Sequence, residues 1–144
     1  MIIHGAFVAG RPAINCPILL PIVSRLSTRR LRLAVQFVVD TGATNSIVLP
    51  VTYEARGFRY SDFREYPQDW ARGYGGEFEV RVVPVTLHLK RSDNGDWHKF
   101  DLDMELAKPD IELDGLPSVI GQDVLDRFEL TVNKAQGIVS FTDP

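Results

Sequence analysis

Hydrophobic and polar residues alternate along most of this chain, which is the pattern of half-buried β-strands. The first predicted strand before Asp40 covers residues 31–39, and every second residue contributes to one apolar face: Leu31, Leu33, Val35, Phe37 and Val39. After Asp40 comes a short apolar run, Ile47-Val48-Leu49, which ends at Pro50 because the proline ring removes a ladder hydrogen-bond donor. Asp40 therefore lies in a tight loop between two predicted strands.

Two turns that contain glycine predict hairpins farther along the chain. The Gly-Tyr-Gly-Gly sequence at residues 73–76 separates residues 66–72 from a strand in which Phe78, Val80 and Val82 alternate with charged residues. At residues 82–84 the apolar parity shifts by one position, so we expect a bulge or a bend there. Asn94-Gly95 is typical of a second hairpin turn.

The end of the chain contains the one segment with helical spacing. Val124, Leu125 and Phe128 share one face of a short helix expected within residues 122–128. Two strands, at residues 129–132 and 137–141, are joined by a turn and close the chain. No internal repeat or linker is visible, so the sequence predicts a single, mainly β domain covering residues 1–144.

The charge balance argues against a nucleic-acid partner. Sixteen basic and nineteen acidic residues give a net charge of -3, the wrong sign for a domain that neutralises phosphates. We interpret the one concentrated basic stretch as a solvated strand face rather than a binding patch. It consists of Arg25, Arg29, Arg30 and Arg32.

The single cysteine and the longest apolar run bear on disulfide formation and on the expected cellular location of the protein. Cys16 cannot form an intrachain disulfide, and we expect it to be a buried structural thiol rather than a nucleophile. The apolar residues 14–23 are interrupted by Pro17 and Pro21 and fall far short of the ~20 residues that span a bilayer. We therefore expect a cytoplasmic protein without a membrane partner.

No cofactor or metal is expected. His4, His88 and His98 are scattered along the chain and share no metal-ligand spacing. The acidic turn at residues 93–96 lacks the alternating oxygen ligands and the terminal glutamate of a calcium loop. Turn chemistry accounts for its composition.

Three separated features of the sequence belong together. They are the hydrophobic run into Asp40-Thr41-Gly42-Ala43, the glycine-rich turn at residues 73–76, and Val119-Ile120-Gly121 before the short helix. In their order and spacing they resemble the single-domain, retrovirus-type aspartic proteases, the retropepsin-like family, over about residues 35–130 of the chain. The resemblance implies a mainly β fold, a closed barrel or sheet with a flap hairpin and one short C-terminal helix.

The chemistry of amide hydrolysis explains why this resemblance implies an assembly. One group must activate water while another protonates the substrate, and two carboxyl groups held close together share a proton and divide these roles. The chain has a single Asp-Thr-Gly sequence. The resemblance therefore implies a homodimer in which Asp40 and its symmetry mate form the catalytic dyad and hydrolyse an extended polypeptide.

The resemblance also assigns roles around Asp40. Thr41 would brace the two loops across the two-fold axis, Gly42 would allow close approach of the peptide backbone, and Gly121 would avoid a clash with the loop. Ala43 stands where many relatives have serine. Because it offers no hydroxyl group to the carboxylate, we expect a mildly acidic pH optimum.

The glycine-rich turn would act as the flap. By resemblance, Gly73, Tyr74, Gly75 and Gly76 close over the substrate and exclude water, with Tyr74 at the tip. A plain surface hairpin with an incidental aromatic residue is the alternative for this segment.

Two positions depart from the viral pattern. Viral members usually carry an acid two residues after the glycine of Asp-Thr-Gly and an arginine after the later glycine, where this chain has Thr44 and Gln122. The departure leaves the affinity of the dimer open.

Two other functions compete with an active protease. One is a catalytically inactive retropepsin-like module that dimerises or binds extended peptides. The other rests on residues 40–46, which also resemble the phosphate loop of actin-like ATPases and sugar kinases. That fold, however, needs two α/β lobes and a far longer chain.

Overall fold

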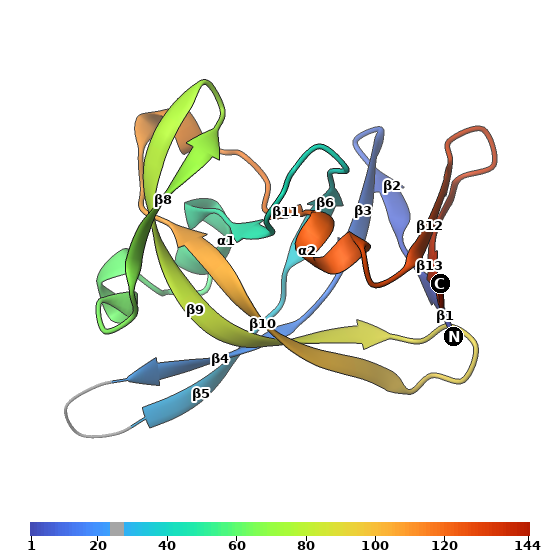
Figure 1. Ribbon diagram of the computed structural model, residues 1–144, viewed down its shortest axis with the longest axis horizontal. Helices are drawn as coiled ribbons and strands as arrows, with labels where there is room; N and C mark the ends of the chain where they lie inside the picture. Colours follow the sequence, from blue (N-terminus) through green and yellow to red (C-terminus); the bar gives the residue numbers. More distant parts are fainter. Residues whose placement is uncertain (24–27) are drawn as a thin grey trace.

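The computed structural model describes residues 1–23 and 28–144, and these form a mainly β fold, as the alternation predicts (Figure 1). The strands of the larger sheet are β2 (Ala6–Val8), β3 (Arg11–Asn15), β4 (Ile18–Val23), β5 (Thr28–Leu33), β6 (Gln36–Val39), β7 (Ile47–Val48), β8 (Gln68–Gly73), β9 (Gly76–Lys90), β10 (Trp97–Ala107) and β11 (Val119–Ile120). Their order is β2-β3-β6-β11-β7-β10-β9-β4-β5, and β8 pairs with part of β9.

The larger sheet is open, so the closed barrel, one detail of the expected fold, is not confirmed. Its order begins at β2 and ends at β5, and these two strands do not pair with each other. The single strand predicted over residues 31–39 is divided into β5 and β6, which pair with β4 and β3. Pro17 stands between β3 and β4 and supplies no N–H, which interrupts the ladder there. The β4–β5 hairpin extends away from the body of the molecule (Figure 1).

The apolar face predicted for residues 31–39 is buried in the main core. Leu33, Val35, Phe37 and Val39 are all buried there, and Leu31 packs against the same cluster. Cys16 lies in this core as a free thiol, and burial raises its pKa to about 12. These surroundings confirm a structural thiol.

The shift in apolar positions along β9 occurs because the strand buries one face near its start and the opposite face farther along. The register between β9 and β10 is unbroken from Lys90–Trp97 to Val80–Ala107, so the ladder contains no bulge, and the long ribbon curves instead (Figure 1). Val83 belongs to the main core. Phe78 and Val80 are buried in a second cluster. The buried face of β9 therefore changes along the strand while the pairing continues.

The structure has two short α-helices, α1 (Pro50–Glu54) and α2 (Gln122–Leu125), and two 3₁₀ turns, η1 (Tyr60–Phe63) and η2 (Ile111–Leu113). α2 lies where the spacing predicts it. The prediction of one helix misses α1, because Pro50 begins a helix rather than only ending a strand. Proline suits the first helical turn, since its φ is preset and its missing N–H would have no partner there.

The two ends of the chain form a small separate sheet. Its order is β1 (Ile2–His4), β13 (Ile138–Thr142) and β12 (Glu129–Asn133), all antiparallel. The hairpin at the C-terminal end is the predicted one. Because β1 pairs with β13 of the same chain, the N- and C-termini lie close together (Figure 1).

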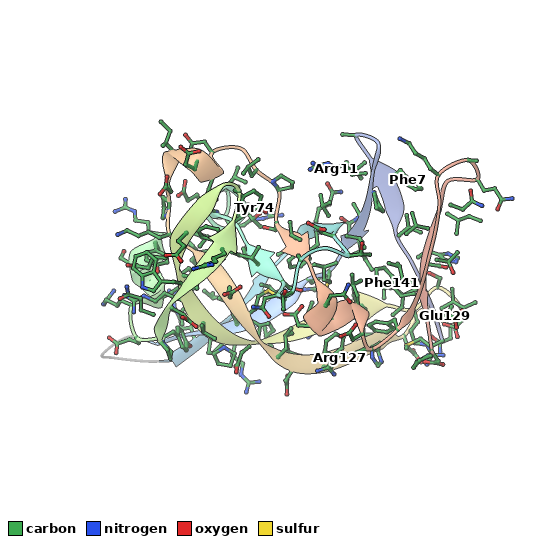
Figure 2. All side chains as sticks on the ribbon, turned by 45° about the horizontal axis from the view of Figure 1, so that its top comes forward. Phe7, Arg11, Tyr74, Arg127, Glu129 and Phe141 are labelled. Atoms are coloured by element: carbon green, nitrogen blue, oxygen red, sulfur yellow. The ribbon has the colours of Figure 1, made fainter. Side chains whose placement is uncertain are left out.

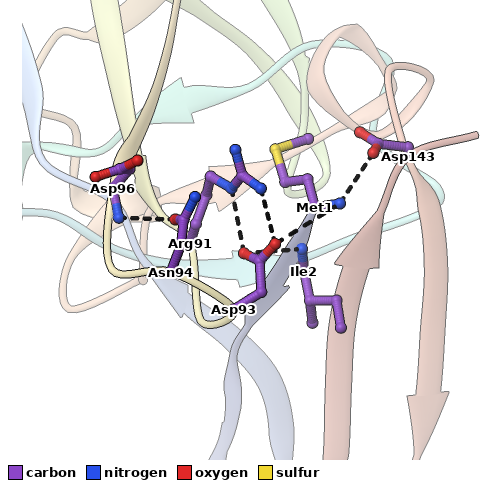
Figure 3. A network of polar contacts seen from close by, with 7 residues as sticks. All are labelled: Met1, Ile2, Arg91, Asp93, Asn94, Asp96 and Asp143. Carbon is purple, nitrogen blue, oxygen red and sulfur yellow. Dashed lines mark hydrogen bonds and ion pairs between the residues drawn. The ribbon is translucent and has the colours of Figure 1, made fainter.

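The outer edge of β1 is occupied by the turn between β9 and β10 (Figure 3). Ser92 donates its backbone N–H to the Ile2 carbonyl at 2.6 Å, and its hydroxyl accepts from the His4 N–H at 3.1 Å. Arg91 binds the Asp93 carboxylate at 2.7 Å, which holds the pKa of Asp93 well below its usual range. In the described chain no strand pairs with the outer side of β12, so β12 carries the open edge of this sheet.

The remaining sequence expectations concern surface groups. Arg29, Arg30 and Arg32 are exposed on β5, as expected of a solvated face, and Arg25 lies outside the described residues. Within residues 1–23 and 28–144, no helix has the length and apolar character needed to cross a membrane. The same residues contain no group of three or more His, Cys, Asp or Glu side chains that could hold a metal ion.

Candidate active-site cleft

Two parallel strands, β6 and β11, position Asp40. Val38 pairs with Val119 and Val39 with Ile120, and the Asp40 N–H donates to the Ile120 carbonyl at 3.0 Å. This last bond extends the ladder by one residue and fixes the start of the loop. Asp40 itself is exposed at the end of the sheet.

The loop orients the Asp40 carboxylate through its own backbone. The Gly42 N–H donates to Asp40 Oδ1 at 2.9 Å, and the Ala43 N–H donates to the Asp40 carbonyl at 3.2 Å. A Cβ at position 42 would lie 3.3 Å from Asp40 Oδ1, a tight contact. Glycine therefore lets the backbone turn closely around the carboxylate.

Gly121 lies directly behind this loop. A Cβ at position 121 would lie 2.6 Å from the Ala43 carbonyl oxygen and 2.9 Å from the carbonyl carbon of Asn45. Both are backbone atoms, which cannot move aside as the end of a side chain can. Only glycine fits at this position without displacing the loop.

A buried hydrogen-bond network joins the far end of the loop to α2. The Ser46 hydroxyl donates to Asp123 Oδ1 at 2.6 Å, and the Ser46 N–H also lies within 3.0 Å of the same carboxylate. The Gly121 N–H donates to the Ser46 hydroxyl at 2.9 Å. Ser46 is fully buried and Asp123 is half-buried, so breaking the bond between Gly121 and Ser46 leaves a buried polar group unsatisfied.

Gln122 and Thr44 each take part in neutral hydrogen bonds between the Asp40 loop and the start of α2. Gln122 donates from Nε2 to the Thr41 carbonyl at 2.6 Å and from its backbone N–H to the Ala43 carbonyl at 2.8 Å. The Asp123 N–H donates to the Thr44 carbonyl at 3.2 Å. The start of α2 therefore holds the loop along most of its length without an ion pair.

The hairpin of β8 and β9 lies across from the loop and ends in a two-residue turn. Tyr74 and Gly75 form this turn with positive φ angles of 52° and 86°, as a two-residue β-hairpin turn requires. Figure 2 shows Tyr74 at the tip of the hairpin. Its ring lies 6.0 Å from that of Phe78, and its side chain remains 41% exposed.

A cleft of about 620 Å³ lies between the loop and the hairpin. Thr41 is not among the residues that line it, and Gly75 and Gly76 line smaller hollows on the hairpin instead. The structure thus brings Asp40, Gly42 and Ala43 together with Gly73 and Tyr74. The full lining is Asp40, Gly42, Ala43, Thr44, Asn45, Ile47, Trp70, Ala71, Arg72, Gly73, Tyr74, Phe78, Glu105 and Val119.

Charges in and around the cleft perturb Tyr74. Burial raises the pKa of its hydroxyl, the negative charge of Asp40 raises it further, and the Arg11 guanidinium opposes both effects. Arg11 lies on the neighbouring β2–β3 hairpin (Figure 2). Tyr74 is therefore within electrostatic range of the Asp40 carboxylate in a single chain.

Several residues of the site were not identified from the sequence. Ser46 and Asp123 lie beside the two recognised motifs, and their short polar side chains are the sequence feature that could have identified them as residues of the site. Glu105 gave no signal, because it is one of several polar residues that alternate along β10. Its position in the cleft follows from the parallel pairing of Glu105 with Ile47, which sequence alone does not reveal.

The mainly β architecture argues against the interpretation of residues 40–46 as a phosphate loop. A strand, β7, follows the Asp40 loop, and the described chain is mainly β, so the two α/β lobes required by the phosphate-loop alternative are not formed. What the loop presents is one exposed carboxylate, oriented by a backbone N–H, at the floor of an open cleft.

Comparison with known proteins supports this architecture. No protein-family model and no curated protein matches the sequence. A retropepsin-like aspartic protease from Rickettsia conorii superposes with a TM-score of 0.51 and 18% identity, over 98% of this chain and 88% of that chain. The EIAV protease complexed with the inhibitor HBY-793 gives a TM-score of 0.40 and 18% identity, over 83% of this chain and 88% of that one. The first likeness agrees with the fold that the motifs imply, and the chain therefore has a retropepsin-like fold.

Proposed function

We propose that this protein is an aspartic endopeptidase that acts as a homodimer, with Asp40 from each of two chains at the catalytic centre. The observation that carries the proposal is the exposed Asp40 carboxylate at the floor of the cleft beneath the β8–β9 hairpin. A cleft open to solvent suits an extended polypeptide better than a small enclosed ligand.

The proposed reaction needs two carboxyl groups that share one proton. The ionised Asp40 takes a proton from water, whose oxygen attacks the peptide carbonyl, while the protonated Asp40 donates to the carbonyl oxygen. In the second half of the reaction the ionised Asp40 takes a proton from one hydroxyl of the tetrahedral intermediate, the C–N bond breaks, and the amine leaves with the proton of the other Asp40. The dyad returns to its singly protonated state.

The other residues of the loop and hairpin would position the reactants. Thr41 would brace the two loops across the axis, Gly42 would admit the peptide backbone, and Ala43 and Gly121 would keep the loop in place. The tip of the hairpin, residues 73–76, would close over the peptide as a flap. A hairpin anchored at its base suits such a motion, and Glu79 binds both the Tyr60 hydroxyl and the Gln68 amide there.

Two features of the described single chain support assembly into a dimer: Asp40 has no second carboxyl among its loop contacts, and one edge of the terminal sheet is open. Asp40 is exposed, and its nearest loop contacts are backbone groups rather than another carboxyl. The β12 edge of the terminal sheet is open for an antiparallel copy of itself, while the β1 edge is already occupied. A two-fold axis near both features would complete the dyad.

Digestion of casein and of a random peptide library tests the activity. We expect the wild-type protein to cut these substrates, and we expect Asp40→Asn to reduce kcat/KM by at least about 10³-fold, since the amide cannot serve as acid or base. The variant retains an acceptor for the Gly42 N–H and should keep its thermal stability. The same products from wild type and Asp40→Asn would contradict the role of Asp40, and no products from either would make the chain a peptide-binding or dimerisation module instead.

A mixing experiment tests whether the second carboxyl comes from a partner. When equal amounts of wild type and Asp40→Asn exchange freely, about a quarter of the dimers carry two aspartates. The activity then falls to about half of that shown by the same wild-type protein alone. Full retention of that activity, together with a monomeric mass in solution, would contradict the shared dyad.

A further inference from the structure

Glu105 is a second carboxylate in the candidate active-site cleft. It lies on β10, where it pairs with Ile47 of β7, and both residues line the cleft that contains Asp40. Its side chain is half-buried. A charged group in such a position is partly removed from water and needs a partner.

The surroundings of Glu105 are acidic. Burial raises the pKa of Glu105, the charges of Asp69 on β8 and Asp123 on α2 raise it further, and a hydrogen bond with Asn45 lowers it. The carboxylates that act on Glu105 are therefore Asp69 and Asp123 rather than Asp40.

No cation of the described chain compensates this charge. Arg72 is the one basic residue among those that line the cleft, and it binds Glu77 at 2.9 Å on the exposed side of the hairpin. None of the ion pairs among residues 1–23 and 28–144 includes Glu105. Asn45, its hydrogen-bond partner, is neutral and leaves the negative charge in place.

Apolar side chains also line the cleft that contains Glu105. Ile47, Val119 and Phe78 line the same cleft, and all three are largely buried parts of the second core cluster. Lysine and arginine combine an apolar stem with a charged end, so they can pack along such a wall and still place the charge on a carboxylate. A wholly apolar side chain would leave the carboxylate unpaired and partly buried.

We propose that Glu105 makes this cleft selective for peptides that place a lysine or arginine side chain beside it. The proposal rests on the proposed peptidase function and adds the class of substrate that the cleft selects. A metal ion is not the fitting occupant, because the described residues contain no group of three potential ligands. A basic peptide supplies the missing charge and the apolar stem together.

Cleavage of matched peptides tests the selectivity. Substrates found by library digestion are resynthesised with lysine or with norleucine at each position in turn, and kcat/KM is measured at pH 7. We expect one position at which lysine is preferred over norleucine, and Glu105→Gln should reduce the ratio of kcat/KM for these two peptides by roughly 3- to 10-fold. Glu105→Lys should favour glutamate there. Glu65→Gln, which changes an exposed carboxylate outside the cleft, is the matched control.

A binding measurement separates failure of this inference from failure of the peptidase proposal. Asp40→Asn and Asp40→Asn/Glu105→Gln are each used to select peptides from a random library. Enrichment of lysine and arginine by the first variant alone supports the role of Glu105, even if the wild type cuts nothing. Equal enrichment by both variants, or cleavage by the wild type with no basic preference at any position, would overturn it while leaving the peptidase proposal intact.

Discussion

The two walls of the cleft are built in opposite ways. The Asp40 loop is held from behind by Gly121, by the buried Ser46–Asp123 network and by Gln122. The tip of the β8–β9 hairpin has exposed residues, and open space surrounds the Cβ positions of Gly75 and Gly76. One wall is fixed on several sides, whereas the other is anchored only at its base.

This difference fits a division of tasks. A carboxylate that exchanges protons must keep its position to within a fraction of an ångström, because small displacements lower the reaction rate strongly. Under the proposed function the hairpin would open and close to admit a polypeptide, and the exposed tip fits such a motion. Changes in the loop should therefore affect stability strongly, and equivalent changes at the tip should affect it little.

The largest effect is expected when a methyl group is added behind the loop. Gly121→Ala places a Cβ against two backbone groups, so we expect the free energy of unfolding to fall by about 3 kcal/mol. Gly76→Ala adds the same methyl group to the hairpin, where nothing lies within 4 Å, and should change stability by less than about 0.5 kcal/mol. Urea denaturation of both variants makes the comparison. Similar losses for the two would show that the walls do not differ in rigidity.

Removing one hydroxyl from the buried network should have the next largest effect. Ser46→Ala leaves the Gly121 N–H without its acceptor and removes a donor from the Asp123 carboxylate, and we expect a loss of about 2 kcal/mol. Ser61→Ala, on the exposed surface of η1, is the matched control. Urea denaturation measures the difference, and a Ser46→Ala loss no greater than that of the control would contradict the network's role.

A change at the tip should separate stability from activity. Tyr74 has a positive φ, which asparagine tolerates better, so Tyr74→Asn should stabilise the hairpin by roughly 0.5 kcal/mol. It also removes the aromatic side chain that lines the cleft, and we expect kcat/KM for peptides to fall several-fold. Urea denaturation and peptide kinetics test the two parts. Unchanged kinetics would leave Tyr74 as a turn residue without a part in binding.

The smallest expected effect is a pH-dependent change in stability at Glu105, which lines the cleft from β10. Burial and nearby carboxylates raise the pKa of Glu105 above its ordinary value near 4.5, so its ionised form is disfavoured in the folded state. This cost is absent below the ordinary pKa and appears as pH rises through the folded pKa. Glu105→Gln should therefore raise Tm by about 2 °C at pH 7 and leave it unchanged at pH 4. A shift of equal size at both pH values would show that ionisation is not the cause.

Local patterns in the sequence predicted the parts of the fold that depend on near neighbours. The buried alternation before Asp40, the turns at Tyr74-Gly75 and Asn94-Gly95, and the helical spacing at Val124 all involve residues a few positions apart. Such patterns involve residues close together in the sequence, so they indicate local structure without knowledge of the tertiary fold. They do not reveal which strands become neighbours, and the closed sheet was expected where an open one forms.

The same limit applies to the site. Asp40 and the hairpin were recognisable as motifs, and the structure places them at one cleft. Ser46 and Asp123 come together across 77 positions of sequence, and Glu105 reaches the cleft only through its pairing with Ile47. Contacts of this kind depend on the tertiary fold. The residues that support the carboxylate were therefore the least predictable part of the site.

The asymmetry of the small terminal sheet limits how copies of this protein can join through it. A sheet with two free edges can add a strand on each side and grow into a filament. Here Ser92 and Asp93 occupy the β1 edge, and the β12 edge is the one left open in the described chain. Pairing through β12 consumes that edge in both copies, so growth through this sheet ends with a closed pair.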